Sequence, residues 1–390
     1  MELVAEKYNQ TDIGLIPGDW EYKEIYSEID LLTGYPFPSN QYSERGTKLL
    51  RGSNIKRGVT DWNEDITQYW EKITNDIKQY ILQEGDIVIA MDGSLVGRSF
   101  ARLSKNDLPA LLLQRVARVR SVKIDMGYLK EFICSDFFTK HCDAVKTSSA
   151  IPHISPSDIR KFKIPIPKTK TEQTAISTAL SDADALITSL EKLIAKKQNI
   201  KQGAMQKLLT PKDNWGVKNL GAFLEYEQPT KYIVTDTEYN DNNQTPVLTA
   251  GKTFILGYTN EEFGIFKNHP VIIFDDFTTA TKFVDFDFKV KSSAMKILKP
   301  TNDKINLRFI YEMMQRINYP MGIGDHKRHW IADYQFIEIY VPSSEEQFSI
   351  SQILSGMDAE IGALEKRLAK IQRIKQAMMQ QLLTGKIRLV

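Results

Sequence analysis

The sequence is poor in cysteine and histidine, and it has no long apolar run. Two cysteines and five histidines in 390 residues leave little material for a disulfide framework or a zinc cluster. Cys134 and Cys142 form no Cys-x-x-Cys pair, so we expect two buried thiols in a reducing compartment. No stretch of about 18 apolar residues is present, so we expect no membrane span. Residues 1–20 carry no basic, apolar leader, which favours a cytoplasmic protein.

An excess of positive charge is also missing. The formal net charge is +2, which by itself does not mark a nucleic-acid-binding protein. If the chain binds DNA, its basic residues must be clustered, or a partner must supply part of the positive surface. The 42% hydrophobic and 26% charged content is that of a soluble globular protein, and the length suggests two or three domains.

Motifs of enzyme chemistry are absent. "AGKT" at 250–253 resembles the end of a phosphate-binding loop, but the full pattern needs glycine where this chain has Pro246. His326 and His329 in "DHKRH" have no further cysteine or histidine nearby to complete a metal site. No nucleophile elbow, zinc-protease helix or dinucleotide fingerprint appears, and no motif for holding a flipped adenine. We therefore expect a non-catalytic protein without a metal or cofactor of its own.

One segment is written twice. Residues 172–212 align with 346–386 without a gap, and 24 of the 41 paired positions are identical. Such self-similarity is the signature of an internal repeat. The element order outside these segments also matches, from "IPGDWEYKEI" and "PKDNWGVKNL" near the start of each half. Further matches pair 49–58 with 246–257, 85–103 with 269–286, a strand at 111–120 with 289–298, a helix at 127–145 with 304–318, and 146–157 with 321–332.

The repeated segments have the pattern of a coiled-coil helix. Apolar residues recur with alternating spacings of four and three, so each copy predicts a helix about 50 Å long with one apolar seam. The two copies are natural partners in an antiparallel pair within one chain, although a zipper between two chains is the alternative. Lysines at 197, 201 and 375 interrupt the seam and are expected to mark an end of the coil or a surface for another subunit. The predicted seam residues are Ile176, Leu180, Ile187, Leu190, Ile194, Ile350, Leu354, Ile361, Leu364, Leu368 and Ile371.

These patterns predict an α+β protein. It has two mixed α/β domains related by an internal pseudo-twofold repeat and separated by two long antiparallel coiled-coil helices. We expect the first globular domain at 1–170, the first helix at 171–210, the second domain at 211–344, and the second helix with a C-terminal tail at 345–390.

Two variable regions, each followed by a nearly identical helix, resemble the specificity subunit of a type I restriction-modification enzyme. The motifs that most strongly indicate this resemblance are the repeated "EQ..IS..LS..DA.I..LEK" pattern and the ending "TGKIRL". Supporting phrases are "LLRGSNIKRG", "LLLQRVARVR", "PVLTAGKTFILGYT" and "DFKVKSSAMKIL". The resemblance covers essentially the whole chain.

The resemblance implies a DNA-binding role within a larger complex. Each globular region would be a target recognition domain for one half of a split, asymmetric double-stranded DNA site, and the helices would set the unread spacing. Two methyltransferase (M) subunits and two translocase-nuclease (R) subunits would join the chain. S-adenosylmethionine, ATP and Mg²⁺ would be used by those partners and not by this chain.

Candidate DNA-binding residues are polar or basic side chains on loops predicted between strands. Arg and Lys favour guanine, and Asn and Gln favour adenine, while contacts to phosphate carry no sequence information. In the first domain the candidates are Arg51, Ser53, Asn54, Lys56, Arg57, Arg98, Thr147, Ser148 and Ser149. In the second they are Lys252, Thr253, Thr278, Thr279, Lys282, Lys327 and Arg328.

Two other functions fit the same sequence. One is a standalone two-headed DNA-binding protein, and the other is a coiled-coil scaffold whose globular domains bind protein. A DNA reader loses affinity steeply as salt rises, whereas a scaffold does not. A standalone binder reaches specific affinity alone, whereas a subunit needs its partner.

Overall fold

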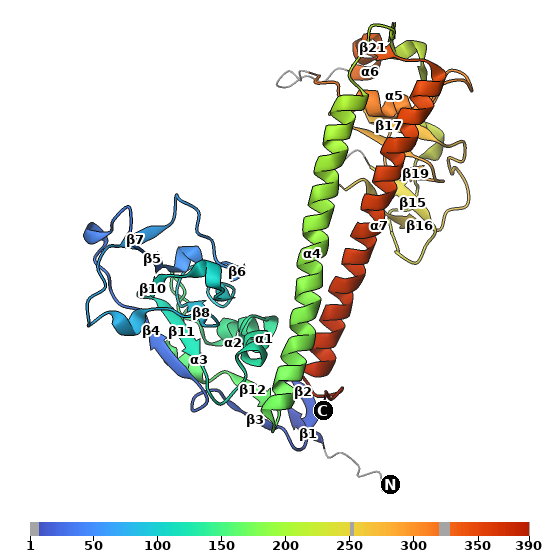
Figure 1. Ribbon diagram of the computed structural model, residues 1–390. Helices are drawn as coiled ribbons and strands as arrows, with labels where there is room; N and C mark the ends of the chain where they lie inside the picture. Colours follow the sequence, from blue (N-terminus) through green and yellow to red (C-terminus); the bar gives the residue numbers. More distant parts are fainter. Residues whose placement is uncertain (1–7, 250–252, 320–327, 390) are drawn as a thin grey trace. The chain divides into compact units, whose positions relative to one another are not determined.

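The computed structural model describes residues 8–249, 253–319 and 328–389 (Figure 1). The chain forms two compact units. Unit 1 holds residues up to 190 together with those from 367 onward, and unit 2 holds 191–366. None of the helices in the described ranges is both long and apolar enough to cross a membrane.

A five-stranded sheet with the order β4-β11-β8-β9-β6 forms the centre of unit 1. Its middle strand β8 reads "IVIA" and is buried along its whole length, as expected of a strand covered on both faces. A second, three-stranded sheet has the order β10-β5-β7, and its strands β5 and β10 are parallel. The strands are β4 Asp30–Thr33, β5 Thr47–Leu50, β6 Arg57–Gly58, β7 Gln68–Trp70, β8 Ile87–Ala90, β9 Phe100–Arg102, β10 Ala110–Leu112 and β11 Val116–Arg120.

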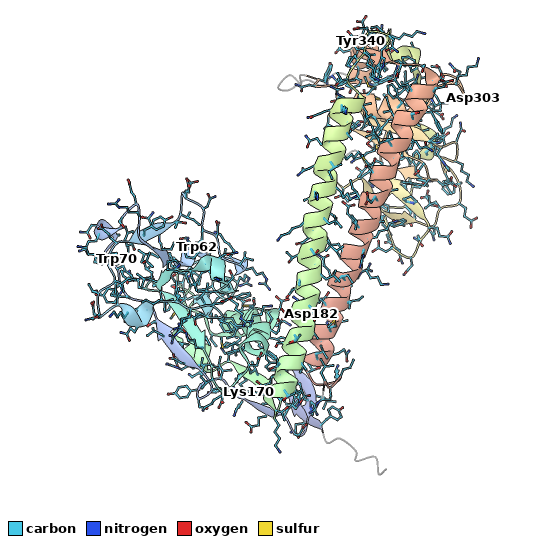
Figure 2. The ribbon with its side chains drawn as sticks, viewed as in Figure 1. Trp62, Trp70, Lys170, Asp182, Asp303 and Tyr340 are labelled. Atoms are coloured by element: carbon cyan, nitrogen blue, oxygen red, sulfur yellow. The ribbon has the colours of Figure 1, made fainter. Side chains whose placement is uncertain are left out.

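The smaller sheet has its own aromatic core. The Phe37 and Trp70 rings meet edge to face with centroids 4.8 Å apart, and Trp62 donates from Nε1 to Asp107 Oδ1 at 2.9 Å. Figure 2 shows Trp62 and Trp70 in the part of unit 1 that lies away from the long helices. Two ribbons complete the strands of this unit: β1 Tyr8–Thr11 with β2 Gly14–Pro17, and β3 Glu21–Glu24 with β12 Lys163–Ile166.

The helix predicted over 127–145 is two helices. α1 spans Met126–Ile133 and α2 spans Asp136–Val145. The break falls at Ser135, whose hydroxyl donates to the Phe132 carbonyl at 2.6 Å and accepts from the Phe137 amide at 3.2 Å. A serine N-cap of this kind starts a new helix in a new direction. The short α3, Pro156–Arg160, follows.

Unit 2 repeats this strand order. Its sheets are β14-β20-β17-β18 and β16-β15-β19, with β15 and β19 parallel, matching β4-β11-β8-β9 and β7-β5-β10 of unit 1. The predicted internal repeat is therefore confirmed at the level of topology. The elements are β13 Gly216–Asn219, β14 Leu224–Glu227, β15 Thr245–Leu248, β16 Ile255–Thr259, β17 Val271–Asp275, β18 Thr281–Val284, β19 Lys289–Val290, β20 Met295–Pro300, β21 Glu338–Val341, α5 Leu307–Met314 and α6 His329–Ala332.

The repeated segments form helices α4, Lys170–Leu208, and α7, Ser344–Leu382, of 39 residues each. Each unit contains one half of each helix (Figure 1). Within unit 1, Glu172 and Asp184 of α4 pair with Arg388 and Lys375, so the two directions are opposite. The predicted seam side chains are all buried or half-buried.

The seam lysines are each ion-paired to a carboxylate of the other long helix. Whether they also mark a surface for another subunit stays a prediction. Lys375 Nζ lies 2.5 Å from Asp184 Oδ1 in unit 1. Lys201 Nζ lies 2.6 Å from Asp358 Oδ1 in unit 2, at the position that the repeat makes equivalent. Lys197 pairs with Glu360 at 2.6 Å. Charged pairs at such positions fix the register of a helix pair at some cost in apolar packing.

The end of each long helix is tied to the beginning of the other. Arg388, after α7, binds Glu172 at the start of α4, with Nη2 to Oε2 at 2.9 Å. Lys212, after α4, binds Glu346 at the start of α7, with Nζ to Oε1 at 2.5 Å. The tail after residue 382 thus packs into unit 1, beside Trp20.

Candidate nucleic-acid interface

Four strand ends meet at one edge of unit 1. The parallel strands β5 and β10 end together, with Leu50 opposite Leu112. The antiparallel strands β8 and β11 meet at the same edge, with Ala90 opposite Val116. The loop after β5, the loop after β8 and the turn between β10 and β11 therefore converge. They enclose a hollow of about 410 Å³, which we call the β8-edge hollow.

Three of the predicted residues line the β8-edge hollow: Arg51, Ser53 and Lys56. Asn54 does not, which corrects its prediction as a reader of bases. Its side chain has no exposed surface. The Oδ1 atom accepts from the Arg51 amide at 3.1 Å, and Nδ2 donates to the Asp61 carbonyl at 3.0 Å. Asn54 shapes the loop that carries its neighbours.

Two of the predicted arginines, Arg57 and Arg98, are held by carboxylates of α2. Arg57 pairs with Asp136 and lies over the Phe100 ring, 5.4 Å from its centroid. Arg98 binds Asp143 through two parallel hydrogen bonds of 3.0 and 2.7 Å. Hydrogen bonds from Arg98 and then Lys146 lower the pKa of Asp143 to about 2. Each of these arginines thus has an aspartate of α2 as its partner.

The predicted polar segment 147–149 lies beside the loop after β8. Thr147 Oγ1 contacts Ser149 Oγ and His153 Nδ1, both at 3.0 Å, while Ser148 is exposed. Gly93 donates its amide to the Pro152 carbonyl at 3.0 Å, which joins the two loops. The structure thus brings this segment to the same edge as the other candidates.

Unit 2 builds the corresponding edge from β15, β17, β19 and β20. Thr253 is exposed after β15, and Lys282 is exposed on β18. Thr278 donates to Asp275 Oδ2 at 2.6 Å, and Thr279 has a φ of 56° in the same turn. The exposed Arg328 precedes α6. Lys252 and Lys327 lie outside the described residues.

Buried charge supports the loop after β17. Asp276 Oδ1 accepts from the Trp330 amide at 3.0 Å, which fixes the chain that follows Arg328. Asp276 also lies 3.3 Å from Lys296 Nζ, and both side chains are almost fully buried. This pair anchors the loop and is not itself available to a ligand.

The sequence reasoning missed the turn between β10 and β11, because it treated 111–120 as one strand. The structure places Gln114 and Arg115 in a turn that lines the β8-edge hollow. Two consecutive polar residues inside an apolar run were the available signal. In unit 2 the corresponding turn carries Lys291 and the exposed Ser292 and Ser293.

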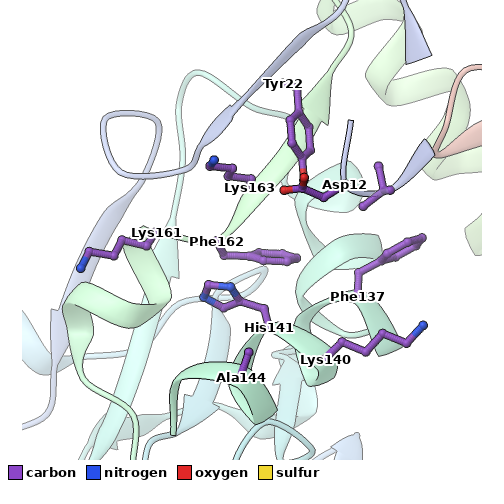
Figure 3. A pocket seen from close by; sticks show the side chains of 10 residues that line it. Asp12, Tyr22, Phe137, Lys140, His141, Ala144, Lys161, Phe162 and Lys163 are labelled. Atoms are coloured by element: carbon purple, nitrogen blue, oxygen red, sulfur yellow. The ribbon is translucent and has the colours of Figure 1, made fainter. Parts of the chain in front are cut away.

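A second hollow of unit 1, of about 620 Å³, lies on another face of α2. In Figure 3 the Tyr22 hydroxyl lies beside the Asp12 carboxylate, and Phe162 lies beside His141. Burial and then the Asp12 charge raise the pKa of Tyr22. The ammonium groups of Lys140 and Lys161 point away to opposite sides (Figure 3), so the charges do not converge on a ligand.

Across the residues that the structure describes, no group of three or more His, Cys, Asp or Glu side chains is placed to hold a metal ion. Burial raises the pKa of both cysteine thiols to about 12.

Residues 17–202 and 212–375 match the family model of the type I restriction modification DNA specificity domain. The chain belongs to this family. The resemblance inferred from the sequence is thus confirmed, and each match contains one of the two edges described above.

Similar proteins agree with this assignment. The specificity subunit of the type I restriction enzyme EcoR124I/EcoR124II of Escherichia coli is 54% identical over 126 residues, which is 32% of this chain and 31% of that protein. The match therefore spans about a third of that relative. The putative MjaX specificity subunit of Methanocaldococcus jannaschii is 26% identical over 424 positions, covering 98% and 97% of the two chains.

The fold is that of a known S subunit structure. The type I restriction-modification S subunit from M. genitalium superposes with a TM-score of 0.68 at 17% identity, over 98% of both chains. At this identity the likeness concerns the fold alone. It supports the predicted pair of mixed α/β domains with two long antiparallel helices.

Proposed function

We propose that this chain is the DNA-specificity subunit of a type I restriction-modification complex. Each unit reads one half of a bipartite, asymmetric double-stranded DNA site through the edge formed by its converging strand ends. The observation that carries the proposal is the duplication of this edge on the same strand order with different side chains. Two such edges suit two different half-sites, because base-edge contacts depend on the identity of each side chain.

In this proposal the chain supplies recognition and its partners supply catalysis. Two methyltransferase subunits methylate adenines with S-adenosylmethionine, and two translocase-nuclease subunits cleave with ATP and Mg²⁺ in the cytoplasm. The net charge of +2 supports a need for partners, since a duplex requires several positive contacts to its phosphates. Helices α4 and α7 act as the spacer that sets the number of unread base pairs.

The proposal is tested by mapping methylated adenines genome-wide in a host that expresses the chain with its methyltransferase. We expect a split motif that disappears when the chain is deleted. Binding of the purified complex to that motif should weaken as salt rises, with a slope that reports the phosphate contacts. Methylation that does not depend on the chain, or a salt-independent interaction, would instead support a standalone or scaffold protein.

A further inference from the structure

The turn between β10 and β11 holds a non-glycine residue in a strained backbone conformation. Arg115 has a φ of 64°. Residues other than glycine rarely adopt this left-handed backbone conformation, and those that do are concentrated at functional sites. In the described ranges the other non-glycine residue with positive φ is Thr279, in the loop after β17 of unit 2. Both edges therefore carry one strained residue.

The strained turn is held by contacts from two other segments, at residues 34–35 and at Met91. The Gln114 amide donates to the Tyr35 carbonyl at 2.9 Å, and the Arg115 carbonyl accepts from the Met91 amide at 2.9 Å. Gly34 lies so close that a Cβ there would be 2.0 Å from the Leu113 carbonyl oxygen. The surrounding structure thus enforces the conformation of Arg115, as a strained residue requires.

The Arg115 side chain is exposed yet oriented. It is 69% exposed, and its Nη1 donates to Asp92 Oδ2 at 2.8 Å. Asp92 is itself fixed, because its backbone forms a β-bridge with His153 and the next amide binds Pro152. One carboxylate therefore aims the guanidinium group at the rim of the β8-edge hollow.

Arg115 leaves one side of its guanidinium group without a protein partner among the described residues. Arg98 uses both terminal nitrogens on Asp143, and Arg57 is packed on Phe100 beside Asp136. The Arg115 Nη1 atom donates to Asp92, whereas its Nε and Nη2 atoms have no hydrogen-bond partner among the residues that the structure describes. Those two donors form one side of the planar guanidinium fork.

We propose that Arg115 reads a guanine in the first half-site, and that Asp92 is its positioning residue. The Nε–Nη2 side of the fork matches the O6 and N7 acceptors that guanine presents in the major groove. This inference rests on the proposed function, and it adds Arg115 as a base-contacting residue at the β8-edge hollow.

The experiment compares R115A, R115K and D92N in the full chain with its methyltransferase partner. Binding is measured with duplexes substituted at each position of the first half-site. We expect R115A to lose discrimination at one G·C pair by about 5- to 150-fold, and R115K to lose less, because lysine also favours guanine but lacks the planar fork. Lysine keeps the positive charge of arginine but not its planar fork. The slope of log affinity against log salt concentration should therefore be the same for R115K as for the parent protein. D92N should reduce the same discrimination by a smaller factor.

The second half-site serves as an internal control and should be read unchanged in every variant. R45A is the matched control, because Arg45 is an exposed arginine that precedes β5 at the opposite end of that strand. Equal weakening for all sequences in R115A, with rescue by R115K, would show a phosphate contact and overturn the inference. Unaltered discrimination would also overturn it. Absence of sequence-specific binding by the parent complex would instead refute the proposed function.

Discussion

Replacement of Asp184 by alanine will loosen the helix pair of unit 1. Asp184 Oδ1 lies 2.5 Å from Lys375 Nζ of α7, and its Oδ2 lies 3.2 Å from Lys130 Nζ of α1. One carboxylate therefore joins α4 to both the other long helix and the globular part of the unit. Without it, the half-buried Lys375 ammonium group loses its carboxylate, whereas Lys130 keeps Glu131 Oε1 at 2.7 Å.

The magnitude follows from the exposure of these groups. The side chains of Lys375 and Asp184 are 21% and 37% exposed, so the pair lies between the surface and buried limits. Exposed pairs contribute about 0.2–1 kcal/mol, and removing one partner of a buried pair costs about 3–5 kcal/mol. After allowance for solvent screening we expect D184A to cost about 1–2 kcal/mol, and a coupling to K375A of about 0.5–1 kcal/mol.

Hydrogen exchange of α4 amides in the full chain is the suitable assay, because a two-unit protein does not unfold as one cooperative step. The expected loss corresponds to exchange about 5- to 30-fold faster in the unit 1 half of α4. D182A is the control: Asp182 lies on the same helix and is exposed (Figure 2). Equal effects of D182A and D184A, or strict additivity of D184A with K375A, would refute the reasoning.

Two further predictions concern the tail and the thiols. R388A should destabilise unit 1 by about 2–4 kcal/mol, because it leaves Glu172, which is 2% exposed, without its cation. K212A should cost less than about 1 kcal/mol, because Lys212 is 60% exposed. Segment-resolved hydrogen exchange measures both, and equal losses would contradict this ranking. Cys134 and Cys142 have thiol pKa values of about 12, so iodoacetamide at pH 8 should alkylate them only after denaturation. Prompt alkylation of the native protein would contradict their burial.

The two edges share a topology but not an electrostatic design. In unit 1, exposed arginines at 57, 98 and 115 each pair with an aspartate. In unit 2 the comparable loop is anchored by the buried pair of Asp276 and Lys296, and the exposed residues are threonines and serines together with Lys282 and Arg328. Side chains that differ this much cannot present the same donors and acceptors, which supports an asymmetric pair of half-sites.

Much of the architecture could be predicted from the sequence because its determinants are local. The heptad pattern of α4 and α7 depends on residues three and four positions apart, and the repeat is visible by direct alignment. Arg51, Ser53 and Lys56, which the sequence analysis proposed as loop residues, line the β8-edge hollow. Whether these three side chains contact DNA stays a prediction.

The tertiary structure decided which of the polar residues are available. Asn54 and Lys56 look equivalent in the sequence, but one is buried in its own loop and the other is exposed. Two of the seam lysines, Lys201 and Lys375, pair with aspartates 157 and 191 positions away. The turn that holds Arg115 packs closely on Gly34, some 80 residues earlier in the chain. The sequence by itself determined the duplication and the helices through short-range periodicity. Long-range packing alone decided the charge partners, because a carboxylate selects its cation by distance in space and not along the chain.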